Sequence, residues 1–276
     1  MILCTALAAA LATATPGSTI AVTGLCPAPI VVTGRTWSPP VTLDLSQATV
    51  PSVAIVDSHG VNIVGGATGP DASSVPGLAI TRSSDFTVDG FSCAGRVRCI
   101  VAGLSSDGVI ANTVVTGSLS DGVDIALSRR IIVDRTTCTG ATPAPRAHAD
   151  CVQLWSRPDA APTADILVRR TLSIGNMQGV SAFNHVRADK LGRMIDDGGF
   201  DRITFTDNLV LTTMPSAIRM MACRACVATG NRAYALPGAL YVANVMVPGL
   251  AADNVRGELP TPLPLGASGA ALAAAR

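Results

Sequence analysis

Short apolar segments separated by turns recur along most of the chain. Within each segment an apolar residue is followed by one of different character and then by another apolar residue, as expected for a strand with one buried face. The segments begin 25, 22, 23, 29, 28, 38 and 22 residues apart. They are Val53–Ile55, Leu78–Ile80, Ile100–Ala102, Val123–Ile125, Val152–Leu154, Val180–Ala182, Ile218–Met220 and Leu240–Val242.

A second apolar segment follows the first at a similar lag in most of these repeats. These second segments are Val61–Val64, Phe86–Asp89, Val109–Asn112, Ile131–Asp134, Ile166–Val168, Ile203–Thr206 and Val227–Thr229. Asparagine falls at or near the corner after several of them, at Asn112, Asn208, Asn231 and Asn254. Asparagine tolerates a left-handed turn and can hydrogen-bond to the next repeat.

A period of about 22 residues with two or three short strands in each repeat is typical of a β-solenoid. A helical solenoid would need amphipathic segments of about ten or more residues, and the repeats contain none. We therefore predict an all-β, single-stranded, right-handed parallel β-helix. The longer steps predict loops inserted between coils, and inserted loops on one side of a solenoid commonly form its binding face. They are Thr139–Ala149, Ser156–Ala164 and His185–Phe200.

The two ends of the chain differ from the repeats. We predict a short amphipathic capping helix at about Thr5–Ala14, because no Lys or Arg precedes this apolar stretch, as a signal peptide would require. Strands are then expected at Ser18–Val22, Pro29–Thr33 and Val41–Leu45. The domain prediction is one β-helix over residues 1–258, with its cap at about 1–17, followed by a Pro-rich and Ala-rich tail at 259–276 that caps the last coil or contacts a partner.

Composition narrows the choice of partners. The net charge is +1, so electrostatics give no reason to expect nucleic acid. No apolar run reaches roughly 20 residues and no polybasic patch is present, so membrane insertion is not expected.

Eight cysteines leave two interpretations open, namely disulfides in an oxidising location or buried thiols that serve as small apolar residues. Cys223 and Cys226 have CxxC spacing, but no second CxxC is present, so zinc is not expected.

Aligning the repeats predicts which side chains stack on the outside of the solenoid, about 4.8 Å apart. One position after the first apolar residue the column is Ala54, Ala79, Val101, Asp124, Gln153, Ser181, Arg219 and Tyr241. Two positions before it the column is Pro51, Pro76, Arg98, Asp121, Asp150, Gln178, Ser216 and Gly238. Three positions after it the column is Val56, Thr81, Gly103, Ala126, Trp155, Phe183, Met221 and Ala243.

The three columns become polar or aromatic over the same central coils. The predicted polar patch contains Asp121, Asp124, Asp150, Gln153, Gln178, Ser181 and Arg219, with Trp155 and Phe183 beside it. Polar groups for sugar hydroxyls next to aromatic rings for a sugar face are the mixture that a carbohydrate site needs. The alternative is a solvated strand face with aromatics under loops. We favour the carbohydrate site because the changes coincide.

Asp121 and Asp150 are expected to lie close together on adjacent coils, with Asp124 as a third carboxylate nearby. Like charges at that distance raise the pKa of one carboxyl, which places an acid beside a base. Such a pair suits glycoside hydrolysis, retaining when the carboxyls are about 5 Å apart and inverting when they are farther apart.

The coil pattern over residues 15–255 and the stretch Leu7–Ile20 resemble the pectin-lyase-like β-helix proteins. Within that superfamily, Asp121–Asp124, Asp150–Val152, Gln178–Val180 and Arg219 are similar to four stretches that form the site of polygalacturonases. The resemblance implies a glycan site on the central coils. Three positions depart from it: Ala149 replaces a paired aspartate, Gln178 replaces a histidine, and Met220–Met221 leave no lysine.

A lyase hypothesis uses other residues. β-Elimination from a uronic acid needs a cation for the carboxylate, for which Arg219 is a candidate, and a base for the C5 proton. Base candidates are His148, Lys190, Arg187 and Arg193. No cofactor is required, although Asp196–Asp197 with Asp124 or Asp150 could bind Ca²⁺.

Three classes of function follow. The first is a polysaccharide lyase or glycosidase with catalytic candidates Asp121, Asp124, His148, Asp150 and Arg219, and with substrate-binding candidates Gln153, Trp155, Gln178, Ser181, Phe183 and Lys190. The second is a non-catalytic tailspike-type protein of a virion, in which case a homotrimer is expected. The third is a structural solenoid without a ligand. The first two predict a polysaccharide partner and an extracellular, periplasmic or virion-associated location.

Overall fold

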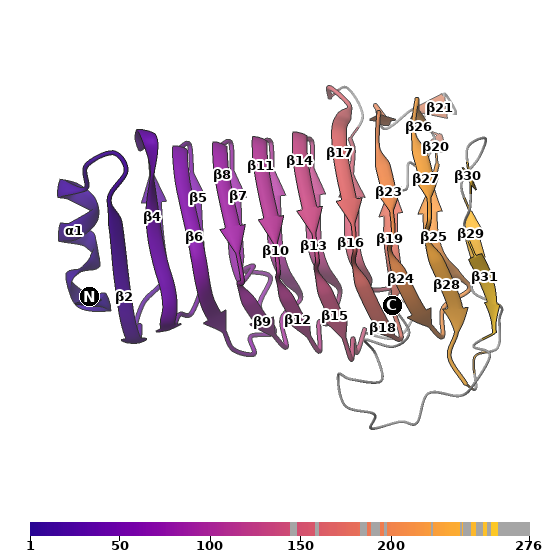
Figure 1. Cartoon of the computed structure of the whole chain (residues 1–276), viewed down its shortest axis with the longest axis horizontal. Helices are drawn as coiled ribbons and strands as arrows, with labels where there is room; N and C mark the ends of the chain where they lie inside the picture. Colours follow the sequence, from indigo (N-terminus) through magenta and orange to yellow (C-terminus); the bar gives the residue numbers. More distant parts are fainter. Residues whose placement is uncertain are drawn as a thin grey trace.

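The structure is a computed structural model that describes residues 1–143, 148–157, 160–182, 187–188, 194–195, 198–221, 223–237, 239, 244–246, 251–252 and 255–258. Strands of successive coils stack side by side along the length of the molecule, with a short helix at the N-terminal end (Figure 1). Every pairing between coils is parallel, which confirms the predicted parallel β-helix.

Each complete coil has three faces. The first face belongs to a nine-stranded sheet in the described part of the chain. Its strands are β3 (Ile30–Thr33), β5 (Val53–Val56), β7 (Leu78–Thr81), β10 (Arg98–Gly103), β13 (Asp121–Ala126), β16 (Asp150–Trp155), β19 (Gln178–Ala182), β25 (Ser216–Met220) and β29 (Asn244–Met246).

The other two faces form one continuous sheet that bends around the core. The second face and the long early strands are β1 (Ile2–Leu3), β2 (Thr19–Leu25), β4 (Thr36–Thr49), β6 (His59–Thr68), β8 (Ser84–Asp89), β11 (Ser106–Ala111), β14 (Arg129–Asp134), β17 (Thr163–Arg169), β22 (Phe200–Asp201), β23 (Thr204–Thr206), β26 (Cys223–Arg224), β27 (Val227–Thr229) and β30 (Ala251–Ala252). The third face contains β9 (Ser92–Ala94), β12 (Val114–Thr116), β15 (Thr137–Thr139), β18 (Leu172–Gly175), β24 (Leu209–Thr212), β28 (Arg232–Ala235) and β31 (Val255–Glu258).

The register of the nine-stranded sheet confirms the predicted columns from the first repeat, where Val53 pairs with Leu78, to the seventh. Leu78 pairs with Ile100, Ile100 with Val123, Val123 with Val152, Val152 with Val180, and Val180 with Ile218. All of these side chains are buried in one apolar core. Burial of a Val, Ile or Leu side chain contributes roughly 1.5–3 kcal/mol, so the inward column fixes the register of each coil.

The prediction for the last coil was wrong. Ile218 pairs with Val245 of β29, and not with Leu240 as the repeat spacing predicted. Both Leu240–Val242 and Val245–Val247 place apolar residues two positions apart, so periodicity alone could not choose between them. Met246 pairs with Arg219 and continues the column of Ser181 and Arg219, and Tyr241 lies outside the described residues.

Hydrogen bonds between side chains and the backbone join the corners of successive coils. After the first face, Ser58, Ser83, Ser105 and Ser128 form a ladder in which each serine oxygen accepts a hydrogen bond from the backbone N–H of the preceding coil at 3.0–3.2 Å. After the second face, Asn208 and Asn231 are buried and do the same. Asn112 instead adopts the left-handed conformation itself, with φ of 53°. Asparagine was thus predicted correctly at the second corner, and the serine ladder was not predicted.

The N-terminal helix is present, as predicted, close to the expected range. A 3₁₀ turn η1 (Cys4–Ala6) leads into α1 (Leu7–Thr13), and Leu7 and Leu11 of that helix are buried in the core cluster. The strand β1 before the helix pairs with β2, which extends the second face by one strand. The helix therefore covers the apolar end of the solenoid.

All eight cysteines form disulfides, so the interpretation as buried thiols was wrong. The pairs are Cys4–Cys26, Cys93–Cys99, Cys138–Cys151 and Cys223–Cys226. Two of them join the third face of a coil to the start of the next strand on the first face, which is where Arg98 and Asp150 begin β10 and β16. The pairing could be assigned only from the positions of the cysteines in space, because their spacing in the sequence does not determine which of them pair.

The positions stacked with Cys99 and Cys151 are occupied by small residues. A Cβ on Gly122 would lie 2.6 Å from the Cys151 carbonyl oxygen and 3.0 Å from the Cys138 sulfur, and a Cβ on Gly179 would lie 2.2 Å from a methyl carbon of Val210. Gly122 therefore leaves room for the disulfide of the neighbouring coil. This small-residue column lies directly beside the outward column that carries the aspartates.

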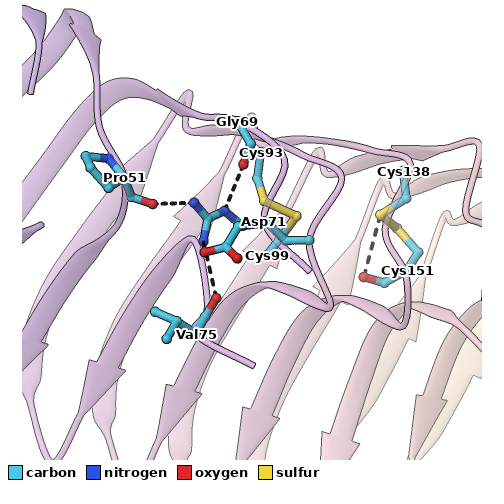
Figure 2. Close-up of a disulfide and its surroundings, with 9 residues drawn as sticks. Pro51, Gly69, Asp71, Val75, Cys93, Cys99, Cys138 and Cys151 are labelled. Carbon is cyan, nitrogen blue, oxygen red and sulfur yellow. Dashed lines mark hydrogen bonds and ion pairs between the residues drawn. A yellow bond between two sulfur atoms is a disulfide. The ribbon is translucent and has the colours of Figure 1, made fainter. Parts of the chain in front are cut away.

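A buried arginine fixes the loop between β6 and β7. The Arg96 guanidinium donates to the carbonyl oxygens of Pro51, Gly69 and Val75 and forms an ion pair with Asp71. Figure 2 shows this network beside the Cys93–Cys99 disulfide. The side chain is 4% exposed, so the charge is desolvated and depends on these partners.

All three predicted insertions contain residues outside the described part, and of the third only residues 187–188, 194–195 and 198–200 are described. In that third insertion β20 (Arg187–Ala188) pairs with β21 (Met194–Ile195), and this pairing is antiparallel. The predicted tail at 259–276 lies outside the described residues, as does Asn254. No helix in the described part of the chain is long and apolar enough to cross a bilayer.

A Gly108→Ala variant tests the close packing of the second face. A Cβ at Gly108 would lie 2.1 Å from the ring of Phe86 on the preceding coil, and overpacking of this kind costs about 1–3 kcal/mol. We expect urea-induced unfolding to show that loss of stability, and a second change, Phe86→Leu, to recover part of it. Gly103→Ala is the matched control because no atom lies within 4 Å of its Cβ position. Equal stability of the two single variants would contradict the packing.

An Arg96→Met variant tests the loop clamp. Removal of one partner from a buried charged network costs about 2–4 kcal/mol, because the remaining polar groups lose their hydrogen bonds. Arg82→Met is the control, since its ion pair with Asp57 also joins two coils but is half exposed and should contribute little to stability. Comparison of the two variants by thermal unfolding would contradict the clamp if Arg82→Met were the more damaging change.

Candidate functional site

The outward face of β10, β13, β16, β19 and β25 brings the predicted polar residues together. Arg98 is opposite Asp121, Asp124 is opposite Gln153, and Asp150 is opposite Gln178. Gln153 is in turn opposite Ser181, and Ser181 is opposite Arg219. The predicted polar patch is therefore one continuous surface.

Asp121 and Asp150 are in direct contact, as the columns predicted. The Asp150 backbone N–H donates to Asp121 Oδ1 at 3.1 Å, and the Ser120 hydroxyl donates to Asp121 Oδ2 at 3.0 Å. The two aspartates are buried, with Asp150 fully inaccessible to solvent. The Asp121 carboxyl is thus held by the neighbouring coil and by a local hydrogen bond.

Asp124 connects this aspartate pair to the aromatic part of the site. Its carboxylate accepts a hydrogen bond from Trp155 Nε1 at 3.2 Å and lies 3.3 Å from Arg98 Nε. Trp155 and Arg98 are both half-exposed, whereas the Asp124 side chain is 4% exposed. The indole ring is therefore oriented by a buried carboxyl while its face remains available to a ligand.

Burial and mutual repulsion shift the pKa values of the aspartates. Burial raises the pKa of Asp121 to about 6, and the charge of Asp150 adds to that shift. The pKa of Asp124 is raised well above its usual range by burial and by the charge of Asp121, although Arg98 and Trp155 oppose the shift. The site therefore holds two neighbouring carboxyls, Asp121 and Asp124, whose raised pKa values favour their protonated forms.

His148 lies at the edge of the aspartate pair. Its Nδ1 is 2.9 Å from Asp150 Oδ2, and the hydrogen bond to Asp150 raises the pKa of the imidazole. The charge of Arg219 acts in the opposite direction on the pKa of His148, so the two cationic groups lie near each other. The histidine side chain is half exposed and can exchange protons with solvent.

Several buried polar atoms on this face have no partner. Among the side-chain atoms that the structure describes, Asp150 Oδ1, Gln153 Oε1 and Ser181 Oγ are buried without a hydrogen bond. They belong to adjacent positions of β16 and β19. Buried polar atoms are nearly always paired in folded proteins, so unpaired atoms mark places where water or a ligand completes the structure. Gln178 is also buried, and Arg219 is half-buried with Nε 3.3 Å from the Met221 sulfur.

A cavity of about 350 Å³ opens beside the aspartates. Its polar and aromatic lining comes from Arg98, Asp124, Trp155, Ser156 and Arg157, and Leu104 and Leu127 add apolar surface. A volume near the lower end of the range for ligand sites suits one or two sugar units. The cavity gives a ligand direct access to Asp124 and to the exposed ring of Trp155.

Sequence reasoning missed Ser120, Arg98 and Arg157 as site residues. Arg98 is in the same aligned column as Asp121, so the alignment of the repeats could have identified it. Ser120 and Arg157 lie outside the three columns. The predicted residues Phe183, Lys190 and Arg193, and the candidate calcium ligands Asp196 and Asp197, lie outside the described residues, and of Arg187 only the backbone is described. Within the described part of the chain, no group of three or more His, Cys, Asp or Glu side chains is placed to hold a metal ion.

Comparison with known proteins adds evidence on the fold. No protein-family model matches the sequence, and no curated protein is detectably similar to it. Solved structures of a tailspike protein mutant of E. coli bacteriophage HK620, in complex with pentasaccharide, are similar with TM-scores of 0.51 and 0.50 at 12% identity. These alignments cover 88% and 79% of this chain and 57% and 51% of the tailspike chains, so this chain spans about half the length of those proteins.

An alginate lyase from Paenibacillus sp. str. FPU-7 is also similar, at 16% identity with a TM-score of 0.44, over 94% of this chain and 98% of that one. At 12% identity the tailspike structures confirm the predicted parallel β-helix and show the fold alone.

An Asp121→Asn variant tests whether burial raises the pKa of the Asp121 carboxyl. In the unfolded chain the Asp121 carboxyl ionises near pH 3.8 and in the folded protein near pH 6, so the folded state retains its proton longer. Wild-type stability therefore falls as the pH rises from about 4 to above 6, by roughly 1–3 kcal/mol. The amide does not titrate, so unfolding experiments should show the variant gaining stability relative to wild type between pH 4 and pH 8.

The control for this prediction is Asp107→Asn, on the second face. The hydrogen bond from Arg130 and that from Ser106 lower the pKa of Asp107 to about 2, so its stabilisation is present above pH 4 and is lost at lower pH. This control should lose stability relative to wild type at pH 8, the opposite sign. If the Asp121→Asn variant were equally destabilised at pH 4 and pH 8, the pKa of Asp121 would not be raised in the folded protein.

Proposed function

We propose that this protein binds a polysaccharide along the outward face of β10, β13, β16, β19 and β25 and hydrolyses a glycosidic bond there. The observation that carries the proposal is the set of coupled buried aspartates, one of which lines a cavity beside an exposed tryptophan. Trp155 offers a flat apolar surface for a sugar ring, and the carboxyl, amide and hydroxyl groups next to it suit sugar hydroxyls. The tailspike structures of similar fold contain a bound pentasaccharide, which supports a glycan ligand for this fold.

The aspartates divide the acid and base roles by their pKa values. Asp124 lines the cavity and its raised pKa favours the protonated carboxyl, so it could donate a proton to the leaving-group oxygen. Asp121 ionises near pH 6 and would then serve as the carboxylate that activates water or attacks the sugar. Two carboxyls with separated pKa values in one site are the arrangement that glycoside hydrolysis uses.

Asp150 and His148 have supporting roles in this proposal. The negative charge of Asp150 contributes to the raised pKa values of both other aspartates, and His148 holds Asp150 through its ion pair. The Cys138–Cys151 disulfide adjoins Asp150 and limits its movement. Gln153, Gln178 and Ser181 would bind sugar hydroxyls, and Arg219 would contact substrate at the far end of the face.

The surroundings of the protein follow from the same chemistry. Four disulfides support an oxidising location, outside the cell, in the periplasm or on a virion surface. A polysaccharide partner is consistent with each of these. A homotrimer stays a prediction that light scattering can test.

Activity on a panel of acidic and neutral polysaccharides tests the proposal. Hydrolysis releases reducing ends without an unsaturated product, and we expect Asp121→Asn and Asp124→Asn each to lose at least about a hundredfold in rate, as for loss of a general acid or base. Asp107→Asn, on the opposite side of the coil, should retain wild-type activity. Ultraviolet absorbance from unsaturated uronate, lost in Arg219→Ala, would instead establish elimination. Binding without either product would establish a recognition protein.

The pH dependence of hydrolysis gives a sharper check on the two roles. Because Asp121 must be ionised, kcat/KM should fall as the pH decreases through about 6, and because Asp124 must be protonated, it should fall again at higher pH. Asp107→Asn should leave this profile unchanged. A profile flat from pH 5 to pH 8 would contradict the assignment of Asp121.

A further inference from the structure

The cavity beside Trp155 has a charge that its role in binding neutral sugar hydroxyls does not require. Two arginines, Arg98 and Arg157, line it together with Asp124. Arg98 is paired with Asp124 at 3.3 Å, and Arg157 is exposed and forms no ion pair with the residues that the structure describes. The positive charge on this cavity therefore exceeds what its single aspartate can neutralise.

Asp124 is the carboxyl that opposes these positive charges in the cavity. Burial and the charge of Asp121 raise the pKa of Asp124, which favours its neutral form and weakens its neutralisation of Arg98. Asp121 and Asp150 lie farther along the same face and are buried, and they do not line the cavity. The groups that face a ligand in the cavity are thus two guanidinium groups and one carboxyl.

A second feature of the cavity indicates a missing polar partner. Ser156 lines the cavity, is 7% exposed, and its hydroxyl has no hydrogen bond to the residues that the structure describes. The residue lies between Trp155, whose ring is oriented by Asp124, and Arg157. An oxygen-bearing ligand in this cavity would satisfy the Ser156 hydroxyl and accept hydrogen bonds from the arginines.

From this arrangement we infer that the cavity is a subsite for a negatively charged sugar unit, held by Arg98 and Arg157 with its ring against Trp155. The inference rests on the proposed polysaccharide binding and specifies its substrate class. A guanidinium group donates two parallel hydrogen bonds that match the two oxygens of a carboxylate, and it matches a sulfate ester in the same way. Leu104 and Leu127 supply the apolar surface against the rest of the sugar.

Binding of matched charged and neutral polysaccharides tests the inference. Each acidic polysaccharide of a panel is compared with its own carboxyl-reduced form, and each sulfated one with its desulfated form, by isothermal titration calorimetry on the full chain. We expect the charged member of a pair to bind at least tenfold more tightly than the neutral member. The difference should shrink as the salt concentration rises from roughly 50 mM to roughly 500 mM, because salt screens the attraction between the arginines and the ligand charge. The pair that shows the difference distinguishes a carboxylate from a sulfate ligand.

Variants of the two arginines identify the source of the preference. Arg98→Gln and Arg157→Gln should each weaken binding of the charged polysaccharide about tenfold, a loss expected for one charge-assisted contact, and leave the neutral form unchanged. Arg157→Lys keeps the charge without the planar fork and should lose less than Arg157→Gln. Arg129→Gln is the matched control, because Arg129 is an exposed arginine of β14 on the second face and does not line this cavity.

The possible outcomes separate this inference from the proposed function. Equal binding of charged and neutral members, or a charge preference that survives in both glutamine variants, would overturn the charged subsite and leave polysaccharide binding intact. Absence of binding to every member of the panel would overturn both.

Discussion

Parallel hydrogen bonding between consecutive coils is the constraint on which the structure depends. It fixes each residue against its equivalent one coil earlier, as Val123 is fixed between Ile100 and Val152. A slip of one residue would turn the inward column out to solvent and polar side chains into the core. The same register lines up the outward side chains, so a change of residue type at one column position in consecutive coils becomes a continuous surface. The site is a consequence of the register, because its residues are far apart in sequence but equivalent in the repeat.

The buried aspartates reduce the stability of the folded state when they are charged, and contacts with the surrounding coils hold them in place. Burial raises the pKa values of Asp121 and Asp124, which means that the folded state tolerates charges it disfavours. Compensation comes from fixed partners: the Asp150 N–H and Ser120 on Asp121, Trp155 on Asp124, and His148 on Asp150. Below them Gly122 makes room for the Cys138–Cys151 disulfide, so the backbone under the aspartates is both close-packed and covalently fastened.

The sequence was sufficient for the fold and for the core of the site, for physical reasons. Each inward Val, Ile or Leu repeats at the period of the coil, so alignment of the repeats gave the register and placed Asp121, Asp124, Asp150, Gln153 and Ser181 on one face. The prediction for the last coil was wrong because two neighbouring stretches fit the same apolar pattern. Disulfide connectivity, the Arg96 clamp and the contribution of Arg157 could not be found by alignment, because each depends on loops whose path the repeat does not determine.

The placement of the aspartates in the middle of a stack also affects how the molecule loses structure. Each coil contacts only its neighbours, so the stack behaves as a linear array in which terminal coils have one neighbour and central coils have two. Fraying therefore starts at the ends, where α1 covers one of them, and must pass through several coils before it reaches β13 and β16. The four disulfides close short segments, with cysteines 3 to 22 residues apart, so each fastens a local corner and none ties one end of the array to the other. Partial melting could thus leave the central coils assembled.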